Sequence, residues 1–536
     1  MVLLNHHKIK LRDFENLLLQ VTDKGVRNQK SKHVFCMKFL KLLTPLVKIP
    51  LSLTALIFLS FSGFQLSGQN AEFTPVDRWY EVYLGGAKVG YVSDTMQKEG
   101  DIIKSRNEFV MQIKRGDVGV EIVVEQETKE KVSGELIDFA RETKMAGMPM
   151  LKKGRVEGNE LVVHEKQFNA EKESKYPFDP DAGMNWGMRK QFLENGFEEA
   201  GKAYELKVYS PDMGLKAPIK ANVVCLGTKL IQVGEEKIQG YEVDMELKGP
   251  FGAMKTKSWF DKDCVALRTE MNMGGLNISM IQVPKKIAKK MEMETQEILF
   301  SSVVPLNATV PKREKNIFMM EMIKGKWTAK LYEGSGQKVE RVDEQSVRVI
   351  VDHSTKKKKG VQEIDVKPFL ASNIYLDTED LLIQKLAKKG KGKAKEPNEI
   401  AKKLTKFVFR YVSEKNYGVG FATASEVARN KEGDCTEHAV LLAALGRVLG
   451  IPSRVVTGLV YANEFEGKKD VLVYHMWTQF YIDNEWVNLD SALGLVKCPA
   501  DRIAFSVDSM EEDAMASVNP VMELINNLKV TIQPVD

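Results

Sequence analysis

Cys435 stands where a reactive side chain is expected, directly after Gly433 and Asp434 and at the start of a long apolar pattern. The apolar residues that follow recur at helical spacing: Val440, Leu441, Ala444, Leu445 and Val448. Asp434, followed three residues later by Glu437, gives the capping-box pattern and places Cys435 at the first helical position. Free backbone N–H groups and the helix dipole favour a thiolate there and can stabilise an oxyanion. The position predicts a nucleophile with a lowered pKa; the alternative is a small residue tolerated at a helix start.

A thiol nucleophile needs a base, and two histidines are candidates. His438 lies three residues after Cys435 on nearly the same side of the helix, but side chains of one helix diverge. The alternative for His438 is a packing or hydrogen-bonding residue. His475 lies in a later segment, YHMWTQFYIDNEWVNLDSA, which alternates like two strands joined by a turn at Asp483 and Asn484.

The register of these two strands decides what His475 meets. A two-residue turn pairs Ile482 with Glu485, and His475 then lies diagonally across from Asp490 on the same face. A carboxylate there can fix the histidine tautomer and hold the ring as a base for the thiol. A three-residue loop would reverse the face, leaving His475 a half-buried strand residue and Asp490 a turn residue. With the two-residue turn, the predicted catalytic residues are Cys435, His475 and Asp490.

A cysteine on a helix, followed by a histidine and an aspartate on neighbouring strands, resembles the transglutaminase-like domain of the papain-like cysteine superfamily in its bacterial exported form. The resemblance rests on residues 424–461, which contain GDC and GIPSRVVTG, and on residues 475–492. It implies that Cys435 is the nucleophile, His475 the general base and acid, and Asp490 the residue that orients the histidine.

The resemblance also bears on two tryptophans and on cofactors. Trp477 and Trp486 match aromatic strand positions of the family, where core packing is expected. Animal members use calcium and a further tryptophan at the oxyanion site, but this sequence contains no acidic calcium loop. No cofactor and no metal are therefore expected.

The elements that position these residues fill only the last part of the chain. We predict an α+β fold with an antiparallel β-rich domain at 72–283, a mixed connecting region at 284–372, a papain-like catalytic domain at 373–520 and a tail at 521–536. The β-rich part alternates apolar and polar residues and predicts hairpins that turn at Gly85–Gly86 and near Asp261 to Asp263. Its opening, WYEVYLGGAKVGY, is similar to β-rich domains found ahead of such catalytic units.

Residues 1–71 are predicted to be a leader. The apolar run at 49–64 follows Lys38, Lys41 and Lys48 and precedes small and polar residues, which is the order of a secretory signal. Cleavage predicts a mature chain that begins near residue 70; the alternative is an uncleaved membrane anchor formed by the same run. Both place the rest of the chain outside the cytoplasm, in the periplasm or the extracellular space.

The composition narrows the class of protein and its partners. Of 536 residues, 43% are hydrophobic and 28% are charged, as in soluble globular proteins, and the length predicts about three domains. The net charge of +5 is small and comes from local lysine runs, so nucleic acid is not an expected partner. Five cysteines form no CxxC pair, which argues against structural zinc. In an oxidising compartment, a disulfide between Cys225 and Cys264 is one option.

The predicted function is that of an exported thiol enzyme that acts on amide bonds of peptides or proteins through an acyl-thioester. Release by water would make it a protease or amidase, and release by an amine a transglutaminase. As the nucleophile, Cys435 is expected to stay reduced, accessible and reactive. The alternative is a non-catalytic protein that binds peptides or serves as an envelope scaffold, and in a further reading the β-rich domain docks on an envelope partner.

Overall fold

A computed structural model describes residues 73–535 except 116–117, 146–147, 168–169, 213, 234–235, 250–251, 274–275, 291–302, 355–364, 415–421, 466, 511–523 and 525–526. The predicted leader, with its apolar run at 49–64, lies outside the described residues. None of the helices in the described part of the chain has the length and apolar content needed to span a bilayer.

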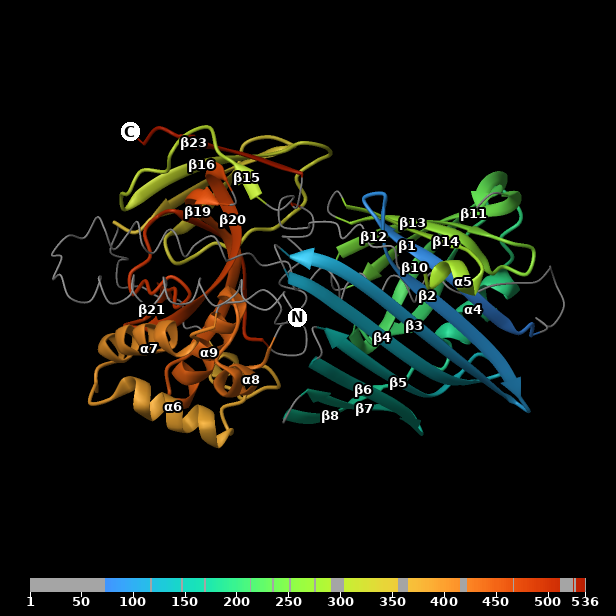
Figure 1. Cartoon of the computed structure of the whole chain (residues 1–536), viewed down its shortest axis with the longest axis horizontal. Helices are drawn as coiled ribbons and strands as arrows, with labels where there is room; N and C mark the ends of the chain where they lie inside the picture. The colour runs from blue at the N-terminus through green and yellow to red at the C-terminus, as the bar shows by residue number, and fades with distance from the viewer. Residues whose placement is uncertain are drawn as a thin grey trace, which may run out of the picture. The chain divides into compact units, whose positions relative to one another are not determined.

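The first part of the described chain is a fourteen-stranded antiparallel sheet (Figure 1). Its strands are β1 (Val76–Leu84), β2 (Ala87–Glu99), β3 (Ile102–Arg115), β4 (Val118–Lys131), β5 (Leu136–Met145), β6 (Met148–Glu157), β7 (Glu160–Gln167), β8 (Ala170–Pro177), β9 (Ala203–Ser210), β10 (Gly214–Val233), β11 (Glu236–Gly249), β12 (Gly252–Phe260), β13 (Ala266–Met273) and β14 (Leu276–Gln282). Pairing of β1 with β14 joins two meanders, β1 to β8 and β9 to β14, into one sheet.

The predicted hairpins are confirmed. Leu84 pairs with Ala87, and Gly85 and Gly86 form the two-residue turn with φ values of 59° and 94°. Two successive positive φ values are the geometry of the turns that suit the twist of a hairpin, and glycine adopts them without strain. The second hairpin connects β12 to β13, where the Asp261 carboxylate accepts a hydrogen bond from the Val265 N–H at 2.8 Å.

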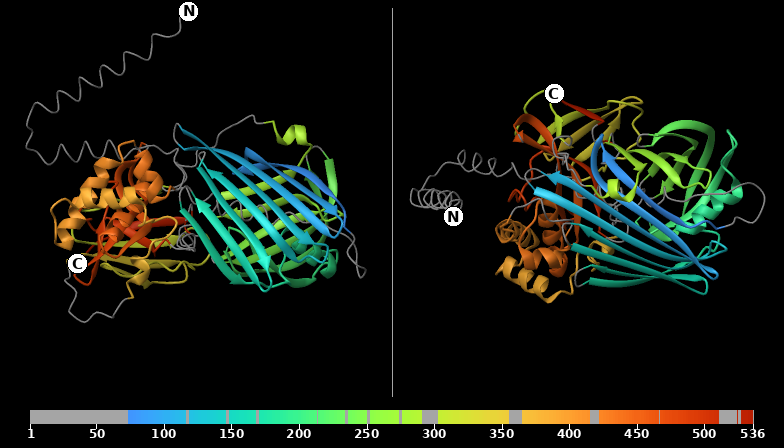
Figure 2. Two further views of the ribbon diagram at one scale, coloured as in Figure 1. Left: turned by 90° about the horizontal axis from the view of Figure 1, so that it is seen from below. Right: turned by 45° about the vertical axis from the view of Figure 1, so that its right-hand side comes forward.

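A helix lies against the inner face of this sheet. The two meanders curve toward each other (Figure 2), and α4 (Asn185–Asn195) packs against β3, β4 and β9. A short helix, α5 (Lys285–Ala288), follows β14 and packs against β1 and β2. Phe192 of α4 contacts Phe260 of β12, with ring centroids 5.7 Å apart. Strands of both meanders therefore share one apolar core with α4.

A buried carboxylate from the sheet holds the start of α4. The Glu130 carboxylate accepts hydrogen bonds from the backbone N–H groups of Met184, Trp186 and Gly187 at 2.8, 2.6 and 2.9 Å. These N–H groups have no partner within the helix, and no side chain of Met184 caps them. A glutamate 54 residues earlier in the chain therefore acts as the cap.

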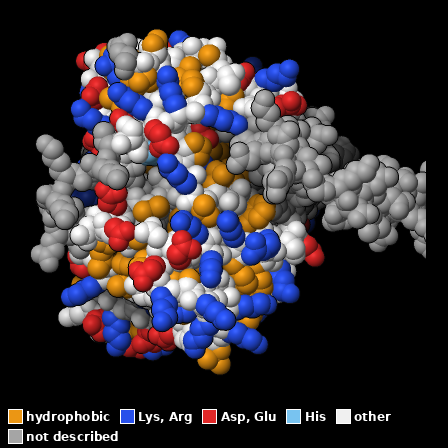
Figure 3. Space-filling view, turned by 90° about the vertical axis from the view of Figure 1, so that its left-hand side faces the viewer, with side chains coloured by type: hydrophobic (Ala, Val, Ile, Leu, Met, Phe, Trp, Pro, Cys, Tyr) orange, Lys and Arg blue, Asp and Glu red, His pale blue; other side chains and the backbone are white. Residues whose placement is uncertain are grey.

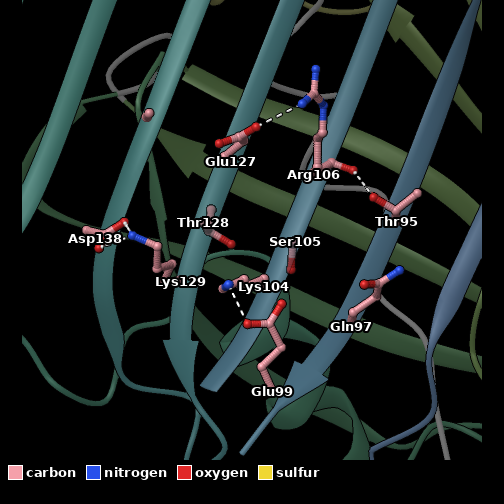
Figure 4. Close-up of a pocket in the computed structure, with 11 residues that line it drawn as sticks. Thr95, Gln97, Glu99, Lys104, Ser105, Arg106, Glu127, Thr128, Lys129 and Asp138 are labelled. Atoms are coloured by element: carbon pink, nitrogen blue, oxygen red, sulfur yellow. Dashed lines mark hydrogen bonds and ion pairs between the residues drawn. The ribbon is translucent and has the colours of Figure 1, made fainter. Parts of the chain in front are cut away.

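The outer face of β2 to β5 carries charges that neutralise each other across neighbouring strands. A depression of about 350 Å³ lies there, and Figure 4 shows that side chains of both signs line it. Arg106 pairs with Glu127 at 3.0 Å, and Lys129 pairs with Asp138 at 2.9 Å. Cross-strand pairs of this kind stabilise a sheet surface and leave little net charge for a ligand.

The second part of the described chain combines four helices with two smaller sheets. The helices are α6 (Leu381–Lys391), α7 (Pro397–Tyr411), α8 (Ala424–Asn430) and α9 (Cys435–Val448), preceded by the 3₁₀ turn η3 (Lys367–Phe369). A five-stranded sheet contains β15 (Val303–Pro305), β19 (Ser453–Phe465), β20 (Lys468–Ile482), β21 (Glu485–Leu489) and β22 (Arg502–Asp508). A four-stranded sheet contains β16 (Lys315–Met322), β17 (Gln337–Arg341), β18 (Ser346–Asp352) and β23 (Leu528–Gln533).

Helix α9 is the centre of this part. It packs against β19 and β20, and α6, α7 and α8 pack around it (Figure 1). Residues 435–447 of α9 are all buried, because the helix is enclosed on every side. The arrangement is an antiparallel β-rich region followed by helices and strands, so the predicted α+β class is confirmed.

The segments predicted as a connecting region at 284–372 and a tail at 521–536 both contribute strands to the two smaller sheets. The mixed connecting region contributes β15 to the five-stranded sheet and β16, β17 and β18 to the four-stranded one. The predicted tail contains β23, which pairs with β16. β15 pairs with β20 and β23 pairs with β16, partners far away in the sequence that the local patterns of β15 and β23 do not show. Both segments therefore take part in the sheets of the second part.

The exposed surface of α6 and α7 is strongly basic. Their apolar sides, with Ile383, Leu386, Leu404 and Val408, face inward, and lysines occupy the outer sides. Residues 381–411 contain ten Lys and Arg but two acidic residues, and the helices lie on the side shown in Figure 3, where basic side chains outnumber acidic ones. Within the described chain, Lys402 alone among these cations forms an ion pair, with Glu399 at 3.0 Å. We call this surface the α6–α7 basic face.

Candidate active site

Cys435 is the first residue of α9, and the predicted capping box is confirmed. The Asp434 carboxylate accepts from the Thr436 N–H at 2.8 Å, and the Glu437 carboxylate accepts from the Asp434 N–H at 2.9 Å. Gly433 has a φ of 139°, and a Cβ added there would lie 2.3 Å from Cγ of Glu437. Glycine at this position therefore leaves the space that Glu437 needs to close the cap.

The predicted chemical state of Cys435 is wrong. Burial raises the pKa of the thiol well above its usual value, and the nearby Asp434 carboxylate raises it further. A hydrogen bond from the Met476 backbone N–H lowers this pKa without offsetting the burial. The thiol is also buried rather than accessible. The helix dipole favours a thiolate at this position, but the free energy of burying a thiolate away from water is larger than the stabilisation from the dipole.

His475 and Asp490 meet as the two-residue turn predicts. Ile482 pairs with Glu485, and Asp483 and Asn484 both have positive φ values, 52° and 64°. The His475 imidazole and the Asp490 carboxylate are hydrogen-bonded, with Nε2 and Oδ2 2.9 Å apart. Both side chains are at most 1% exposed. The predicted register and the contact between these side chains are thus present.

The loop after β21 fixes the Asp490 carboxylate. Its backbone exchanges hydrogen bonds with Leu495, at 2.9 and 2.8 Å, and Oδ1 accepts from the Leu493 N–H at 3.1 Å. Oδ1 is thereby occupied by the loop, and Oδ2 points to the histidine. Asp490 therefore reaches His475 from a hydrogen-bonded turn that follows β21, not from within the strand.

Helix α9 is fastened to the strand that carries His475. The Thr436 hydroxyl donates to Sδ of Met476 at 3.4 Å, and the Thr478 hydroxyl donates to the Ala439 carbonyl at 3.0 Å. The Cys435 thiol accepts from the N–H of Met476, the residue after His475. These bonds place the thiol beside the backbone of the histidine strand.

His438 takes a different part. Its Nδ1–H donates to the carbonyl oxygen of Asp434 at 2.7 Å, and its own carbonyl accepts from the Ser491 hydroxyl at 3.0 Å. The ring is completely buried in the first turn of α9. The reading of His438 as a hydrogen-bonding residue fits these contacts.

Arg502, at the start of β22, was missed by the sequence reasoning. Its Nη1 donates to Oδ2 of Asp490 at 2.9 Å, and its guanidinium lies 5.4 Å from the centre of the Trp477 ring. Burial favours a raised pKa for Asp490, but His475 and Arg502 outweigh it and hold that pKa well below its usual range. Arg502 pairs with Val460 in the sheet, a partner 42 residues earlier in the chain that no local pattern reveals.

The two tryptophans of the β20–β21 hairpin are packed in the core, as expected. Trp477 stacks beside His475, with ring centroids 6.3 Å apart, and its indole N–H donates to Oδ1 of Asn488 at 2.8 Å. Trp486 lies under Arg454, whose guanidinium is 3.8 Å from the ring centre. The indole of Trp477 thus forms one wall for both the histidine and Arg502.

The described cysteines other than Cys435 are buried and carry free thiols: Cys225, Cys264 and Cys498. The optional disulfide between Cys225 and Cys264 is not formed. No group of three or more His, Cys, Asp or Glu side chains in the described ranges is arranged to hold a metal ion.

Comparison with known proteins identifies the domain that holds these residues. Residues 384–491 match the family described as the transglutaminase-like superfamily, so this part of the chain is a transglutaminase-like domain. No curated protein matches the chain.

Three solved structures are similar to parts of the chain. A candidate cysteine protease from Cytophaga hutchinsonii is 16% identical over 41% of this chain and 87% of its own, with a TM-score of 0.26. A β-barrel-like protein of a domain of unknown function from Brucella abortus is 16% identical over 39% of this chain and 95% of its own, with a TM-score of 0.31. A candidate protease from Parabacteroides distasonis is 12% identical over 64% of each chain, with a TM-score of 0.18.

Proposed function

We propose that this protein is a thiol enzyme that attacks the carbonyl of an amide bond in a peptide or protein and forms an acyl-thioester on Cys435. The observation that carries the proposal is the buried hydrogen bond between His475 and Asp490, formed beside the N-terminus of the helix that bears the thiol. The match of residues 384–491 to the transglutaminase-like superfamily supports the same chemistry.

Asp490 sets the tautomer of His475. A carboxylate with a depressed pKa is ionised and can only accept a hydrogen bond. Nε2 of His475 therefore carries a proton, and this N–H donates a hydrogen bond to Oδ2 of Asp490. Nδ1 is then left with its lone pair and is the atom that takes the thiol proton. Because the Cys435 pKa is raised, the thiolate forms when the base removes the proton and is not present at rest.

The reaction follows from these roles. As Nδ1 of His475 accepts the proton, the sulfur bonds to the carbonyl carbon and the carbonyl electron pair moves onto oxygen. The backbone N–H of Cys435 is the donor for that oxyanion, because the N–H groups of Thr436 and Glu437 are bonded to the Asp434 carboxylate. Collapse breaks the carbon–nitrogen bond, and the leaving amine takes the proton from His475. The resulting thioester is released by water as an acid or by an amine as a new amide, and His475 again accepts and returns the proton.

One observation favours the alternative, a non-catalytic peptide-binding or scaffold protein. Cys435 is fully buried and its pKa is raised, which in isolation describes an inert structural cysteine. The buried His475–Asp490 hydrogen bond weighs against it, because a binding protein has no need for a histidine held by a carboxylate next to a thiol.

The deciding experiment is to capture the acyl-enzyme. The full chain is incubated with a pool of peptides, and a covalent mass increase that hydroxylamine removes is sought by intact mass spectrometry. We expect the adduct on Cys435 and its loss in Cys435→Ala. Cys498→Ala is the matched control, since Cys498 is a buried thiol of the same region. Equal turnover by wild type and Cys435→Ala would refute the mechanism.

We further propose export. The support is the lysine-flanked apolar run at 49–64, which precedes the described domains. In that location the substrates would be peptides or proteins of the periplasm or cell exterior, and the β-rich domain would be available to an envelope partner.

A further inference from the structure

The Asp490 carboxylate is cut off from water, so its charge depends on the groups around it. Oδ2 lies 2.9 Å from both Nε2 of His475 and Nη1 of Arg502. The exposed fractions of these three side chains are at most 2%. An isolated carboxylate in such a place would take up a proton, because the free energy of burying an unpaired charge is large.

Five titratable or charged groups face Asp490, and one is a permanent cation. They come from four segments of the chain: Cys435 of α9, His475 of β20, Cys498 and Asp501 before β22, and Arg502 at the start of β22. Asp501 is a second carboxylate and accepts from Nε of Arg502 at 3.3 Å. Of the two groups that bond Oδ2 of Asp490, Arg502 is the permanent cation, so it stabilises the Asp490 charge whatever the state of the His475 ring.

The shape of the guanidinium matters as well as its charge. Arg502 turns Nη1 to Asp490 and Nε to Asp501, while the guanidinium lies next to the Trp477 ring. A planar cation with donors on two edges can make these contacts together, whereas a lysine ammonium is a point charge on a flexible stem. The Trp477 ring in turn lies beside the His475 ring.

We propose that Arg502 is the positioning residue of this site: its guanidinium keeps Asp490 deprotonated and turned toward His475, and so fixes the proton on Nε2 and the lone pair on Nδ1. Its catalytic consequence rests on the proposed function, because it matters for turnover only if Cys435 is the nucleophile. Its structural consequence, the state of the His475–Asp490 pair, stands by itself.

The test of that state uses the full chain and does not require activity. The chain has seven histidines, so histidine-labelled protein gives a spectrum in which His475 is assigned by loss of its signal in His475→Ala. The measured quantity is the midpoint pH of the change in the Nε2–H chemical shift of His475 that accompanies proton uptake by Asp490 on acidification. In Arg502→Gln, we expect this midpoint to rise by about one to three pH units, the shift that an adjacent opposite charge causes.

The matched control is Arg454→Gln. Arg454 is also a buried arginine of this sheet and packs on a tryptophan, but it bonds to Gln479 and Tyr332 rather than to Asp490. We expect Arg454→Gln to leave the midpoint at the wild-type value. If folded Arg502→Gln also keeps the wild-type midpoint, or if both variants shift it equally, the proposal is overturned.

Arg502→Lys decides the matter if Arg502→Gln does not fold. It retains the charge but loses the planar contacts, so we expect a midpoint near that of wild type and a kcat about tenfold to a hundredfold lower with little change in KM. A midpoint about one to three pH units or more above that of wild type would contradict the proposal. The two proposals can fail separately. If Arg502→Gln shifts the midpoint but the wild-type protein never forms an acyl-enzyme, the proposed function is wrong and the role of Arg502 in holding Asp490 remains.

Discussion

At Cys435, burial outweighs the helix dipole, and the thiol holds its proton until a base removes it. In the proposed mechanism, reactivity belongs to a cluster of residues: the thiol is the nucleophile, His475 supplies the lone pair and Asp490 supplies the charge that orients the ring. The backbone N–H of Met476 links the thiol to the strand of the base. Substitution of each of these residues should therefore reduce the rate of acyl transfer by a different amount.

The two histidines near the thiol should separate clearly. We expect His475→Ala to lose acyl-transfer activity by about a hundredfold to ten-thousandfold, because it removes the base. His438→Ala should lose far less, because Nδ1 of His438 is bonded to the Asp434 carbonyl and serves the helix start. Initial rates of thioester formation measure both, after thermal melts have shown that each variant is folded. The reverse order of effects would contradict the roles given to the two rings.

Asp490→Asn should fall between the two histidine variants. Asparagine keeps the shape and the loop contact of Oδ1 but presents no charge to His475, so the ring loses its preferred tautomer without losing the base. We expect partial activity, measured by the same initial rates. An effect larger than that of His475→Ala would mean that Asp490 does more than orient the ring.

For single residues, the sequence predicted which side chains meet, but it did not predict how deeply they are buried or which distant residues contact them. His475 and Asp490 could be paired because a two-residue turn fixes the register between them, and that register is observed. The state of Cys435 could not be predicted, since it depends on how completely other elements cover the helix start. Arg502 could not be found because it reaches the site through pairing with a strand that ends 37 residues before it.

Helices α9 and α4 differ in how their N-terminal N–H groups are capped. The start of α9 carries its own capping box, visible as Asp434 and Glu437 in the sequence. The start of α4 has no cap of its own and relies on Glu130 of β4. Element boundaries with local caps can be predicted from sequence, whereas a cap supplied from a distant strand cannot. β15 and β23 likewise pair with strands far away in the sequence, so their place in the sheets cannot be predicted from local patterns.

Loss of the Glu130 carboxylate, which caps α4, should destabilise this helix specifically. Glu130→Gln keeps the shape of the side chain but removes the charge that three N–H groups bond, so we expect the free energy of opening α4 to fall by about 1.5 to 3 kcal/mol. Hydrogen exchange of the amides of residues 185–195 measures this quantity. The control is Glu135→Gln, whose glutamate is partly exposed and pairs with Lys131, and which should change it by less than about 0.5 kcal/mol. Equal protection in both variants would show that Glu130 is not the cap.

For the whole molecule, the described chain begins after the predicted leader. We expect the expressed protein to start near residue 70 and to be found outside the cytoplasm, because the apolar run at 49–64 has the flanks of a secretory signal. N-terminal sequencing together with cell fractionation tests this. A full-length chain in the membrane fraction would indicate the anchor instead. Retention of residues 1–48 in a cytosolic protein would contradict export altogether.

The α6–α7 basic face makes the distribution of charge in this chain strongly asymmetric. The segment of residues 381–411 has a larger excess of positive charge than the whole chain, whose net charge is +5, so the remainder is net negative. Such a molecule experiences a torque in the field of any polyanion or acidic surface and rotates before it touches. This steering acts within a Debye length of about 8 Å at physiological ionic strength and weakens as salt is added. The direction of an encounter is thus selected by a surface that takes no part in the chemistry.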